Sequence, residues 1–544
     1  MYPVIQEGRN VTLTETYFTM PDGVRLYTRM VVPKGVSTCP IVLYRDPYEP
    51  PHHGKPHDVA AYESNPFIAH GYAVIHQHCR GRGDSEGICR PYVEREDGLA
   101  TLEAIRLLPF YQGEIYAYGG SYTATVHYAY LGDNPPDVKG AALAIQSDSV
   151  YYNRYRNGCN MGLCNLPWWT GMIARQFPEQ HWEGALKRPY RKVLERIIGQ
   201  EDPAFTNMIL HPVKDEAWID ERSFCADCMT APTLFIEGWY DFYLEGMLSV
   251  WERLSPETRK RSALILGPWG HATGLLPDDP YPAKGGNLPA DHVVAWFDSL
   301  RNGTPYPYAA CGEATYYAVG EKAWRRAAYP FSQAGEKTFY LRPDRTVGDA
   351  PDGAGEVTYT YDPDRDLDEQ GCLRREDVDI FRVFRLKAYP LPAADDVAVF
   401  TSAPLTEPLS FFGRPHWRMK VRSDCEDTAF YLRLYLVEDG VAYNLTDTMV
   451  PLSLFAPDYR PGETVLLDVE LPPMAATLLP GQSLRIDVAS RGGPFLPHAN
   501  VKGHWAEVTQ TRIAHNTLIL DGDATLTLPL ADHPLREMSS PHTL

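Results

Sequence analysis

The sequence predicts an α/β fold with a doubly wound, mostly parallel sheet, followed by a C-terminal all-β domain of the jelly-roll kind. Up to residue 333, short apolar runs alternate with amphipathic segments of helical length, the pattern of a parallel sheet covered on both faces. From residue 334 onward helical spacing largely disappears, and alternating segments separated by proline and glycine take over. A chain of 544 residues is too long for one hydrophobic core, so several domains are expected.

Local patterns predict the elements of the α/β part. Residues 11–33 alternate in polarity around an Asp-Gly pair, which predicts a β-hairpin. Residues 94–108 keep apolar side chains at helical spacing until Pro109 ends the helix. Further short apolar runs predict buried strands, and a second amphipathic run predicts a helix. The strands are expected at 40–44, 72–77, 115–118, 138–145, 233–238 and 262–267, and the helix at 291–300.

These patterns divide the chain into four segments. Residues 1–149 and 229–333 are expected to form the first and second parts of the α/β domain. Residues 150–228 are rich in aromatic side chains among helical stretches, so we expect a helical cap inserted over the sheet edge. Residues 334–544 are expected to form the jelly-roll domain.

The net charge of the chain indicates which classes of partner are expected. The chain carries 51 basic and 70 acidic residues, a formal net charge of −19. Nucleic acid is not an expected partner, because binding it requires a cationic surface. No membrane span is expected, since no run of about 18 apolar residues occurs, and the first residues lack the pattern of a signal peptide. A cytoplasmic protein is therefore expected, and assembly into a homo-oligomer is left open.

The ten cysteines are scattered at low density, which predicts reduced thiols. Cys225 and Cys228 have the spacing of half a zinc site or of a redox pair. No second cysteine pair or paired histidine accompanies them, so we expect a structural role. The acidic run 362–368 lacks the glycine and the glutamate of a calcium loop. No metal and no cofactor are expected.

One stretch carries the strongest sign of chemistry, residues 114–130 (EIYAYGGSYTATVHYAY). A strand-like run ends at two glycines, Ser121 follows, and the next residues can be helical as far as Leu131. This is the layout of a nucleophile elbow, in which the turn exposes the serine hydroxyl above the sheet and the glycines remove Cβ atoms that would collide. A Gly-Gly-Ser tripeptide is more often a plain loop, so the interpretation depends on partners elsewhere in the chain.

Two later residues supply such partners. Asp241 and His271 each stand a few residues beyond a predicted strand, and chemistry in parallel sheets gathers at the carboxyl ends of strands. With Ser121 they follow the chain order Ser, Asp, His that α/β-hydrolase sheets use. We therefore predict a triad in which Ser121 is the nucleophile, His271 the general base and acid, and Asp241 the group that orients the imidazole.

An oxyanion formed at this serine requires hydrogen-bond donors. The first predicted donor is the backbone N–H of Tyr122, the residue after the nucleophile. The second donor usually comes from a loop after an early strand. Tyr48 lies in that position, so its hydroxyl is the second candidate.

With these residues in place, the sequence resembles the cocaine esterase/X-Pro dipeptidyl-peptidase family of serine hydrolases, also called CocE/NonD. The matching stretches span nearly the whole chain in family order: 21–25 (PDGVR), 45–48 (RDPY), 80–87 (RGRGDSEG), 119–122 (GGSY), 238–241 (GWYD), 267–271 (GPWGH), 361–364 (YDPD) and 401–408 (TSAPLTEP). The resemblance implies an α/β-hydrolase domain, a helical cap and a C-terminal jelly roll packed beside the active site. It also implies the triad above, with Tyr48 and Tyr122 as oxyanion donors.

The chain departs from the family at two places. The family elbow commonly reads G-x-S-Y-x-G, whereas here Ala124 fills the last position. The branch that hydrolyses α-amino esters carries acidic residues two and three places after the triad aspartate. Here Tyr243 and Leu244 stand there, with Glu245 one place later, which argues against recognition of a free α-amino group. An apolar or aromatic acyl group is expected instead, bound by Trp168, Trp169, Trp239, Phe242 and Tyr243.

The leading hypothesis is a serine hydrolase that cleaves a small-molecule ester or amide through an acyl-enzyme on Ser121. An X-Pro dipeptidyl-peptidase is the alternative among enzymes. The alternative that is not an enzyme is a binding protein, in which the hydrolase fold is inert and the jelly roll binds a ligand. A dinucleotide site at Gly81-Arg82-Gly83 is not expected, because the fingerprint G-x-G-x-x-G is incomplete there.

Overall fold

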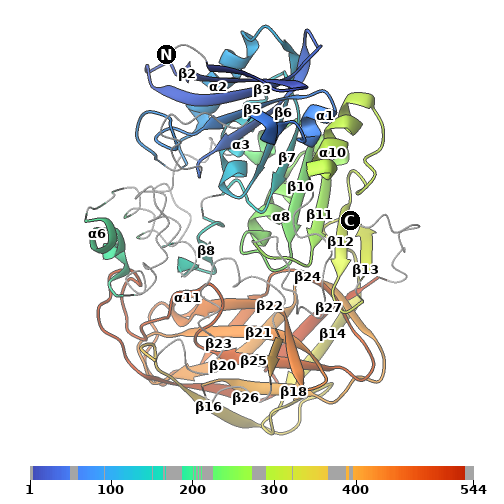
Figure 1. Cartoon of the computed structure of the whole chain (residues 1–544). Helices are drawn as coiled ribbons and strands as arrows, with labels where there is room; N and C mark the ends of the chain where they lie inside the picture. The colour runs from blue at the N-terminus through green and yellow to red at the C-terminus, as the bar shows by residue number, and fades with distance from the viewer. Residues whose placement is uncertain are drawn as a thin grey trace.

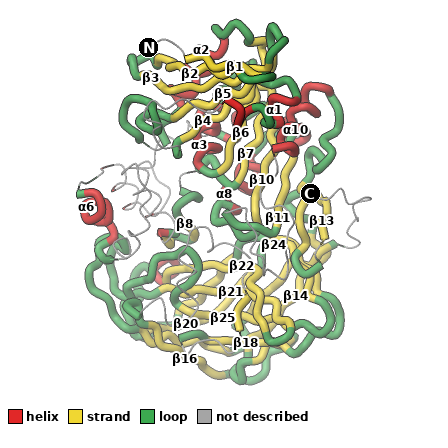
Figure 2. Tube along the Cα trace, viewed as in Figure 1, coloured by secondary structure: helices red, strands yellow, loops and turns green. Residues whose placement is uncertain are grey.

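The chain forms two lobes, an α/β lobe from its N-terminal and middle parts and a β-rich lobe from its C-terminal part (Figure 1). The structure, a computed structural model, describes residues 4–48, 59–90, 92–149, 151–162, 166, 187–199, 201, 203, 206, 210, 225–271, 290–321, 323–365, 388–390 and 396–532. Figure 2 shows strands in both lobes, with the longer helices packed around the sheet of the first.

One mixed sheet forms the centre of the α/β lobe. Its strand order is β1-β2-β3-β5-β4-β6-β7-β10-β11-β12-β13, and neighbours from β5 to β12 pair in parallel. Antiparallel strands extend the sheet at both edges. The strands are β1 (Val4–Glu7), β2 (Val11–Thr19), β3 (Arg25–Pro33), β4 (Cys39–Asp46), β5 (Ala73–His78), β6 (Tyr111–Gly120), β7 (Val138–Ala144), β10 (Thr233–Gly238), β11 (Ala263–Gly267), β12 (Ala314–Ala318) and β13 (Ala323–Ala327).

Helices cover both faces of this sheet. On β10, Leu234 and Ile236 belong to one apolar cluster, whereas Phe235 between them belongs to another. The first cluster includes side chains of α1 (Pro66–Ala69) and α10 (Ala290–Asn302). The second includes side chains of α2 (Arg95–Arg106), α3 (Tyr122–Leu131) and α8 (Leu244–Arg253). Figure 1 shows α3 and α10 on opposite sides of the strands, so the predicted doubly wound sheet is confirmed.

The predicted elements of this lobe are present, with ends shifted by a few residues. The hairpin pairs β2 with β3 and places Thr19 opposite Arg25, on either side of the predicted turn. The largest difference is at β6, which begins at Tyr111 rather than at Ile115. Its first residues are partly exposed, so they lack the apolar run by which a buried strand is recognised.

The β-rich lobe consists of a second extended sheet in the order β16-β26-β20-β27-β14-β15-β18-β25-β21-β22-β17, with β19, β23 and β24 paired to it off this path. On β20, Trp417, Met419 and Val421 alternate inward, as predicted for a half-buried strand. The strands are β14 (Gln333–Leu341), β15 (Thr346–Gly348), β16 (Gly355–Tyr361), β17 (Ala388–Pro390), β18 (Ala398–Ser402), β19 (Leu409–Gly413), β20 (His416–Ser423), β21 (Ala429–Glu438), β22 (Val441–Pro451), β23 (Val465–Glu470), β24 (Met474–Leu478), β25 (Ser483–Ala489), β26 (Ala514–Leu520) and β27 (Thr525–Ala531).

The two lobes are joined directly. Val319, just after β12, forms a parallel bridge with Ala476 of β24. Beside it, the Thr477 hydroxyl donates to the Glu321 carboxylate at 2.6 Å. The last strands of the α/β sheet therefore bond to the β-rich lobe, and this holds the second lobe against the side of the sheet that carries β10 to β13.

Part of the predicted cap is described. Short elements occur at β8 (Tyr155–Arg156), β9 (Cys159–Asn160), η2 (Tyr190–Lys192) and α6 (Val193–Ile198). The η2–α6 segment contacts the β-rich lobe, where the Arg191 N–H donates to the Ala506 carbonyl at 2.9 Å. Figure 1 shows α6 beside that lobe. Most of residues 163–224 lies outside the described residues.

The remaining described helical elements are short: η1 (Val59–Tyr62), η4 (Ala226–Cys228), α9 (Pro256–Arg261) and α11 (Leu452–Phe455). Within the described ranges, no helix combines the length and the apolar character that crossing a membrane requires.

Candidate active site

Ser121 lies in a sharp turn between β6 and α3, with backbone angles φ 55° and ψ −135°. A positive φ at a residue other than glycine is strained, by about 1–3 kcal/mol, and persists only where the surroundings enforce it. Here the Ser121 N–H donates to the Ala144 carbonyl at 2.9 Å, and the Ser121 carbonyl accepts from the Ala124 N–H at 2.8 Å. The turn is thus fixed by β7 on one side and by the first turn of α3 on the other.

The two glycines before Ser121 differ in importance. A Cβ on Gly119 would lie 2.2 Å from the Thr123 carbonyl oxygen, so only glycine fits there. A Cβ on Gly120 would meet its nearest neighbour, the Ala144 Cβ, at 3.7 Å, which is ordinary contact. The expectation that both glycines avoid a collision is therefore wrong for Gly120. Ala124 is fully buried within α3.

The three residues of the predicted triad meet at the carboxyl ends of their strands. Ser121 Oγ lies 2.9 Å from His271 Nε2. His271 Nδ1 lies 3.0 Å from Asp241 Oδ2. The other Asp241 oxygen accepts the Tyr243 N–H at 2.9 Å, so both carboxylate oxygens are held. The Asp241 side chain is fully buried and that of His271 is 9% exposed, an arrangement that shields the pair from water.

The two predicted oxyanion donors also meet, and they bond to each other. The Tyr122 N–H donates to the Tyr48 hydroxyl oxygen at 3.1 Å. That hydroxyl lies 3.2 Å from Ser121 Oγ. Both donors therefore stand beside the serine, where an oxygen seated between them could accept from each.

Tyr48 is positioned by a carboxylate two residues earlier. The Tyr48 N–H donates to Asp46 Oδ1 at 2.6 Å, which fixes the turn after β4. The second oxygen of Asp46 lies 3.1 Å from His76 Nε2 on the neighbouring strand β5. The guanidinium of Arg82 donates to the Pro47 carbonyl. Asp46 and Arg82, from two separate motifs of the sequence, and His76 of β5 thus help to hold the loop that presents Tyr48.

A buried polar network below the elbow was not predicted from the sequence. The Tyr122 hydroxyl donates to the Glu94 carboxylate and accepts from the Tyr92 N–H at 2.5 Å. Arg154 donates to the Tyr92 hydroxyl and, at 3.5 Å, to the Tyr243 hydroxyl. Burial raises the pKa of Glu94 to about 7, although the bond from Tyr122 opposes the shift. The network connects Tyr122, the residue after Ser121, with the loop that follows Asp241.

The predicted acyl-pocket residues divide into three groups. Trp168 and Trp169 lie outside the described residues. Phe242 and Tyr243 flank His271, with ring centroids 4.7 Å and 5.2 Å from that of the imidazole. Trp239 is 5% exposed, and its indole N–H donates to the Tyr317 carbonyl at 2.8 Å, so it packs between β10 and β12.

Trp239 also lines a cavity of about 40 Å³ between the two lobes. Arg156 and Asp241 from the α/β lobe and Asn444 and Asp447 from the β-rich lobe are among its other lining residues. A space of this size can hold water.

Glu245 is neutralised by two guanidinium groups. Its carboxylate lies 2.9 Å from Arg156 Nε and 2.7 Å from Arg414 Nη1, the latter from the β-rich lobe. Arg156 also lies 3.5 Å from Asp447, which extends the ion-pair network across the lobe interface. Glu245 is the acidic residue closest in sequence to the family's ammonium-binding position. Here it forms an ion pair between the two lobes.

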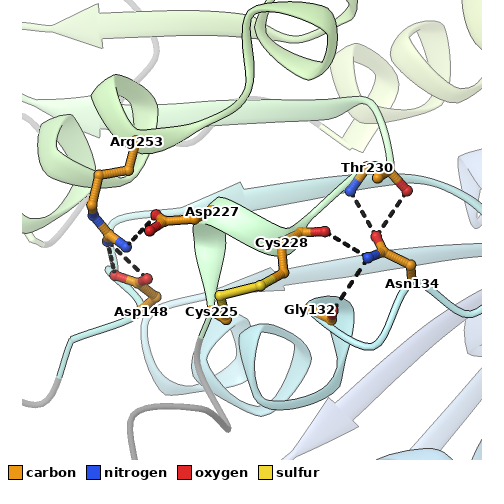
Figure 3. The surroundings of a disulfide bond; sticks show 8 residues. All are labelled: Gly132, Asn134, Asp148, Cys225, Asp227, Cys228, Thr230 and Arg253. Atoms are coloured by element: carbon orange, nitrogen blue, oxygen red, sulfur yellow. Dashed lines mark hydrogen bonds and ion pairs between the residues drawn. A yellow bond between two sulfur atoms is a disulfide. The ribbon is translucent and has the colours of Figure 1, made fainter.

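Cys225 and Cys228 form a disulfide, so the expectation of reduced thiols is wrong for this pair (Figure 3). The Asn134 amide, just past the end of α3, donates to the Cys228 carbonyl at 2.5 Å. Arg253, the last residue of α8, bonds to Asp227 between the two cysteines at 2.8 Å. The disulfide turn thus holds the far ends of the two helices that begin beside Ser121 and Asp241. The structural role predicted for these cysteines agrees with this arrangement.

Comparison with known proteins gives two family matches. Residues 22–273 match the model of the X-Pro dipeptidyl-peptidase (S15 family). Residues 312–528 match the model of the X-Pro dipeptidyl-peptidase C-terminal non-catalytic domain. The first match contains the elbow and the positions of the predicted triad, and the second contains most of the β-rich lobe.

Whole-chain relatives agree with these matches. The cocaine esterase of Rhodococcus sp. (strain MB1 Bresler) is 24% identical over 540 residues, covering 90% of this chain and 92% of its own. Among solved structures, an α-amino acid ester hydrolase matches with a TM-score of 0.80 and 18% identity, covering 98% of both chains. An aminopeptidase from a marine sediment Thaumarchaeota archaeon matches with a TM-score of 0.79 and 18% identity, covering 96% of both chains. The likeness to these two structures shows the fold.

The predicted resemblance is therefore confirmed across both lobes. The chain belongs to the CocE/NonD, or X-Pro dipeptidyl-peptidase-like, family of serine hydrolases.

Proposed function

We propose that this hydrolase cleaves a small-molecule carboxylic ester or amide through a covalent acyl-enzyme on Ser121. The observation that carries the proposal is the continuous set of contacts from Asp241 through His271 to Ser121, at 3.0 and 2.9 Å. A serine hydroxyl is a weak nucleophile near neutral pH, and this arrangement provides the base that activates it and the carboxylate that orients the base.

The first half of the reaction acylates the serine. Ser121 Oγ attacks the carbonyl carbon while His271 Nε2 takes the hydroxyl proton, and the carbonyl oxygen becomes an oxyanion. The oxyanion replaces the Tyr48 oxygen as acceptor of the Tyr122 N–H, and the Tyr48 O–H turns to donate to it as well. The bond to the leaving group then breaks, and His271 returns the proton to the departing alcohol or amine.

The second half repeats these steps with water. His271 takes a proton from a water molecule, whose oxygen attacks the acyl carbon, and a second oxyanion forms between Tyr48 and Tyr122. Its collapse breaks the bond to Ser121 Oγ, which regains the proton from His271, and releases the carboxylic acid.

Two observations favour an ester without a free α-amino group over an X-Pro peptide. Glu245, the acidic residue nearest the family's ammonium-binding position, is neutralised by Arg156 and Arg414. The side chains that flank His271 are the aromatic rings of Phe242 and Tyr243. The whole-chain relative named cocaine esterase takes its name from an ester, which also supports this ranking.

Turnover of two chromogenic substrates tests the proposal. We expect wild-type protein to hydrolyse p-nitrophenyl esters of apolar acids with a higher kcat/KM than Ala-Pro-p-nitroanilide, and Ser121→Ala to hydrolyse neither. Faster turnover of the anilide would assign the protein to the X-Pro peptidases. Equal ester turnover by wild type and Ser121→Ala would contradict the acyl-enzyme, and no turnover of either class by wild type would favour the inert fold.

A further inference from the structure

Glu237 places a carboxyl group in an apolar layer of the protein. It is the fifth residue of β10 and is fully buried. Because alternate strand residues share a face, Glu237 points to the same side as Phe235, toward the layer that contains α3 and α8. A charged carboxylate in such a layer is strongly disfavoured unless a cation or a proton neutralises it.

The two oxygens of Glu237 have different surroundings. Oε1 accepts the Gly238 N–H at 2.8 Å. Oε2 is buried and accepts no hydrogen bond from any residue in the described part of the chain. A buried carboxyl oxygen without a donor is explained if the oxygen itself carries a proton and donates it.

The acceptor for that proton is the triad aspartate. The Glu237 and Asp241 side chains are within hydrogen-bonding contact, and two carboxyl groups can make such a bond only if one of them is protonated. The Asp241 oxygens already have two partners, the Tyr243 N–H at 2.9 Å and His271 Nδ1 at 3.0 Å. Burial, followed by the charge of Asp241, raises the pKa of Glu237 well above its usual range, so the shared proton belongs to Glu237.

Tyr128 interacts with Glu237, Asp148 and Arg253, and these groups do not change the assignment. Tyr128 of α3 is fully buried, and its hydroxyl donates to the Gln146 carbonyl at 3.5 Å. Asp148, beyond β7, is held by Arg253 of α8 at 2.6 and 2.8 Å, so that guanidinium is committed to another carboxylate.

We propose that Glu237 is a protonated positioning residue that donates a hydrogen bond to Asp241 and holds its carboxylate in line with His271. Asp241 would then be held by three donors: Glu237, the Tyr243 N–H and His271. Glu237 would act through Asp241 and touch no substrate. The inference rests on the proposed function, since it assigns Asp241 to the triad.

Two substitutions of similar size separate this role from a purely structural one. In Glu237→Gln the amide N–H₂ can donate to Asp241 while its oxygen accepts the Gly238 N–H, as the protonated acid does. Glu237→Met fills the space but cannot donate. We expect Glu237→Gln to retain kcat within about twofold and Glu237→Met to lose about tenfold in kcat with little change in KM, because a lost hydrogen bond to a charged group weakens orientation.

The pH dependence gives the second readout. Without the hydrogen bond from Glu237, the negative charge of Asp241 is less compensated. Its attraction for the protonated His271 ring therefore increases. We therefore expect the acidic limb of the kcat profile to move to higher pH in Glu237→Met and to stay in place in Glu237→Gln. Loss of activity in Glu237→Gln equal to that in Glu237→Met, or a wild-type profile in Glu237→Met, would overturn the proposal.

A measurement without turnover keeps the two claims distinguishable. In a Ser121→Ala background, NMR titration of the His271 ring reports its protonation directly, whether or not the protein hydrolyses the chosen ester. We expect a higher titration midpoint with Glu237→Met and an unchanged one with Glu237→Gln. Equal midpoints in Ser121→Ala alone and in its combinations with Glu237→Met and Glu237→Gln would contradict the role of Glu237. Full ester turnover by Ser121→Ala would contradict the proposed function instead.

Discussion

Replacing His271 by alanine is expected to lower kcat for a p-nitrophenyl ester by about 10⁶-fold, the scale seen when the base of a Ser-His-Asp triad is removed. The Nε2 atom of the His271 imidazole lies 2.9 Å from Ser121 Oγ, close enough to take the proton of the serine hydroxyl. In the proposed mechanism it also returns that proton to the leaving group, so its loss affects both steps of acylation. The measurement is kcat from initial rates, with circular dichroism to confirm that the variant is folded.

The chain offers a matched control for this variant. The exposed His70 makes a similar contact to a carboxylate, with Nδ1 2.6 Å from Asp298 Oδ2, but the pair lies on the surface at the end of α1. His70→Ala is expected to keep wild-type kcat. Similar activity in His271→Ala and His70→Ala would show that His271 is not the base.

Replacing Tyr48 by phenylalanine is expected to lower kcat by about 10²- to 10³-fold, the usual effect of removing one oxyanion donor. The substitution removes only the hydroxyl, which lies 3.1 Å from the Tyr122 nitrogen and 3.2 Å from Ser121 Oγ. Because the negative charge develops only in the transition state, KM should change little. Steady-state kinetics with one ester at fixed pH separates the two parameters.

Tyr17→Phe provides the control for Tyr48→Phe. Tyr17 is a partly buried tyrosine on β2, in the N-terminal hairpin, and the same atom is removed there. We expect it to retain wild-type kinetics. If Tyr48→Phe also retained them, the second oxyanion donor would have to be another group, and the early loop that carries Tyr48 would have only a packing role.

The sequence was sufficient for the sheet and for the relative positions of the candidate catalytic residues. Apolar runs mark buried strands, and the carboxyl ends of parallel strands meet at one edge, so Ser121, Asp241 and His271 could be placed together. The strain at Ser121 was foreseeable from the glycine before it. The different importance of the two glycines could not be predicted. It depends on the three-dimensional position of the Thr123 carbonyl oxygen, which would lie 2.2 Å from a Cβ atom on Gly119.

Polar contacts between segments that are distant in the chain could not be predicted from the sequence. Glu237 reads as one residue of an apolar strand, and only its burial and its contact with Asp241 indicate a proton-sharing pair. Glu245 could be placed one residue beyond the family's ammonium-binding positions, but its ion pair with Arg414 of the other lobe could not be predicted. Neither partner is marked by a local pattern, since hydrophobic periodicity reports which face is buried and says nothing about polar partners.

The central claim is that Ser121 forms the covalent intermediate, and site-specific labelling with a fluorophosphonate tests it most directly. The reagent phosphonylates an activated serine, and digestion followed by mass spectrometry locates the adduct. We expect a single adduct on the peptide containing Ser121 in wild type and in Ser402→Ala, a substitution on β18 of the β-rich lobe, and none in Ser121→Ala. Equal labelling of wild type and Ser121→Ala, or an adduct on another serine, would contradict the account.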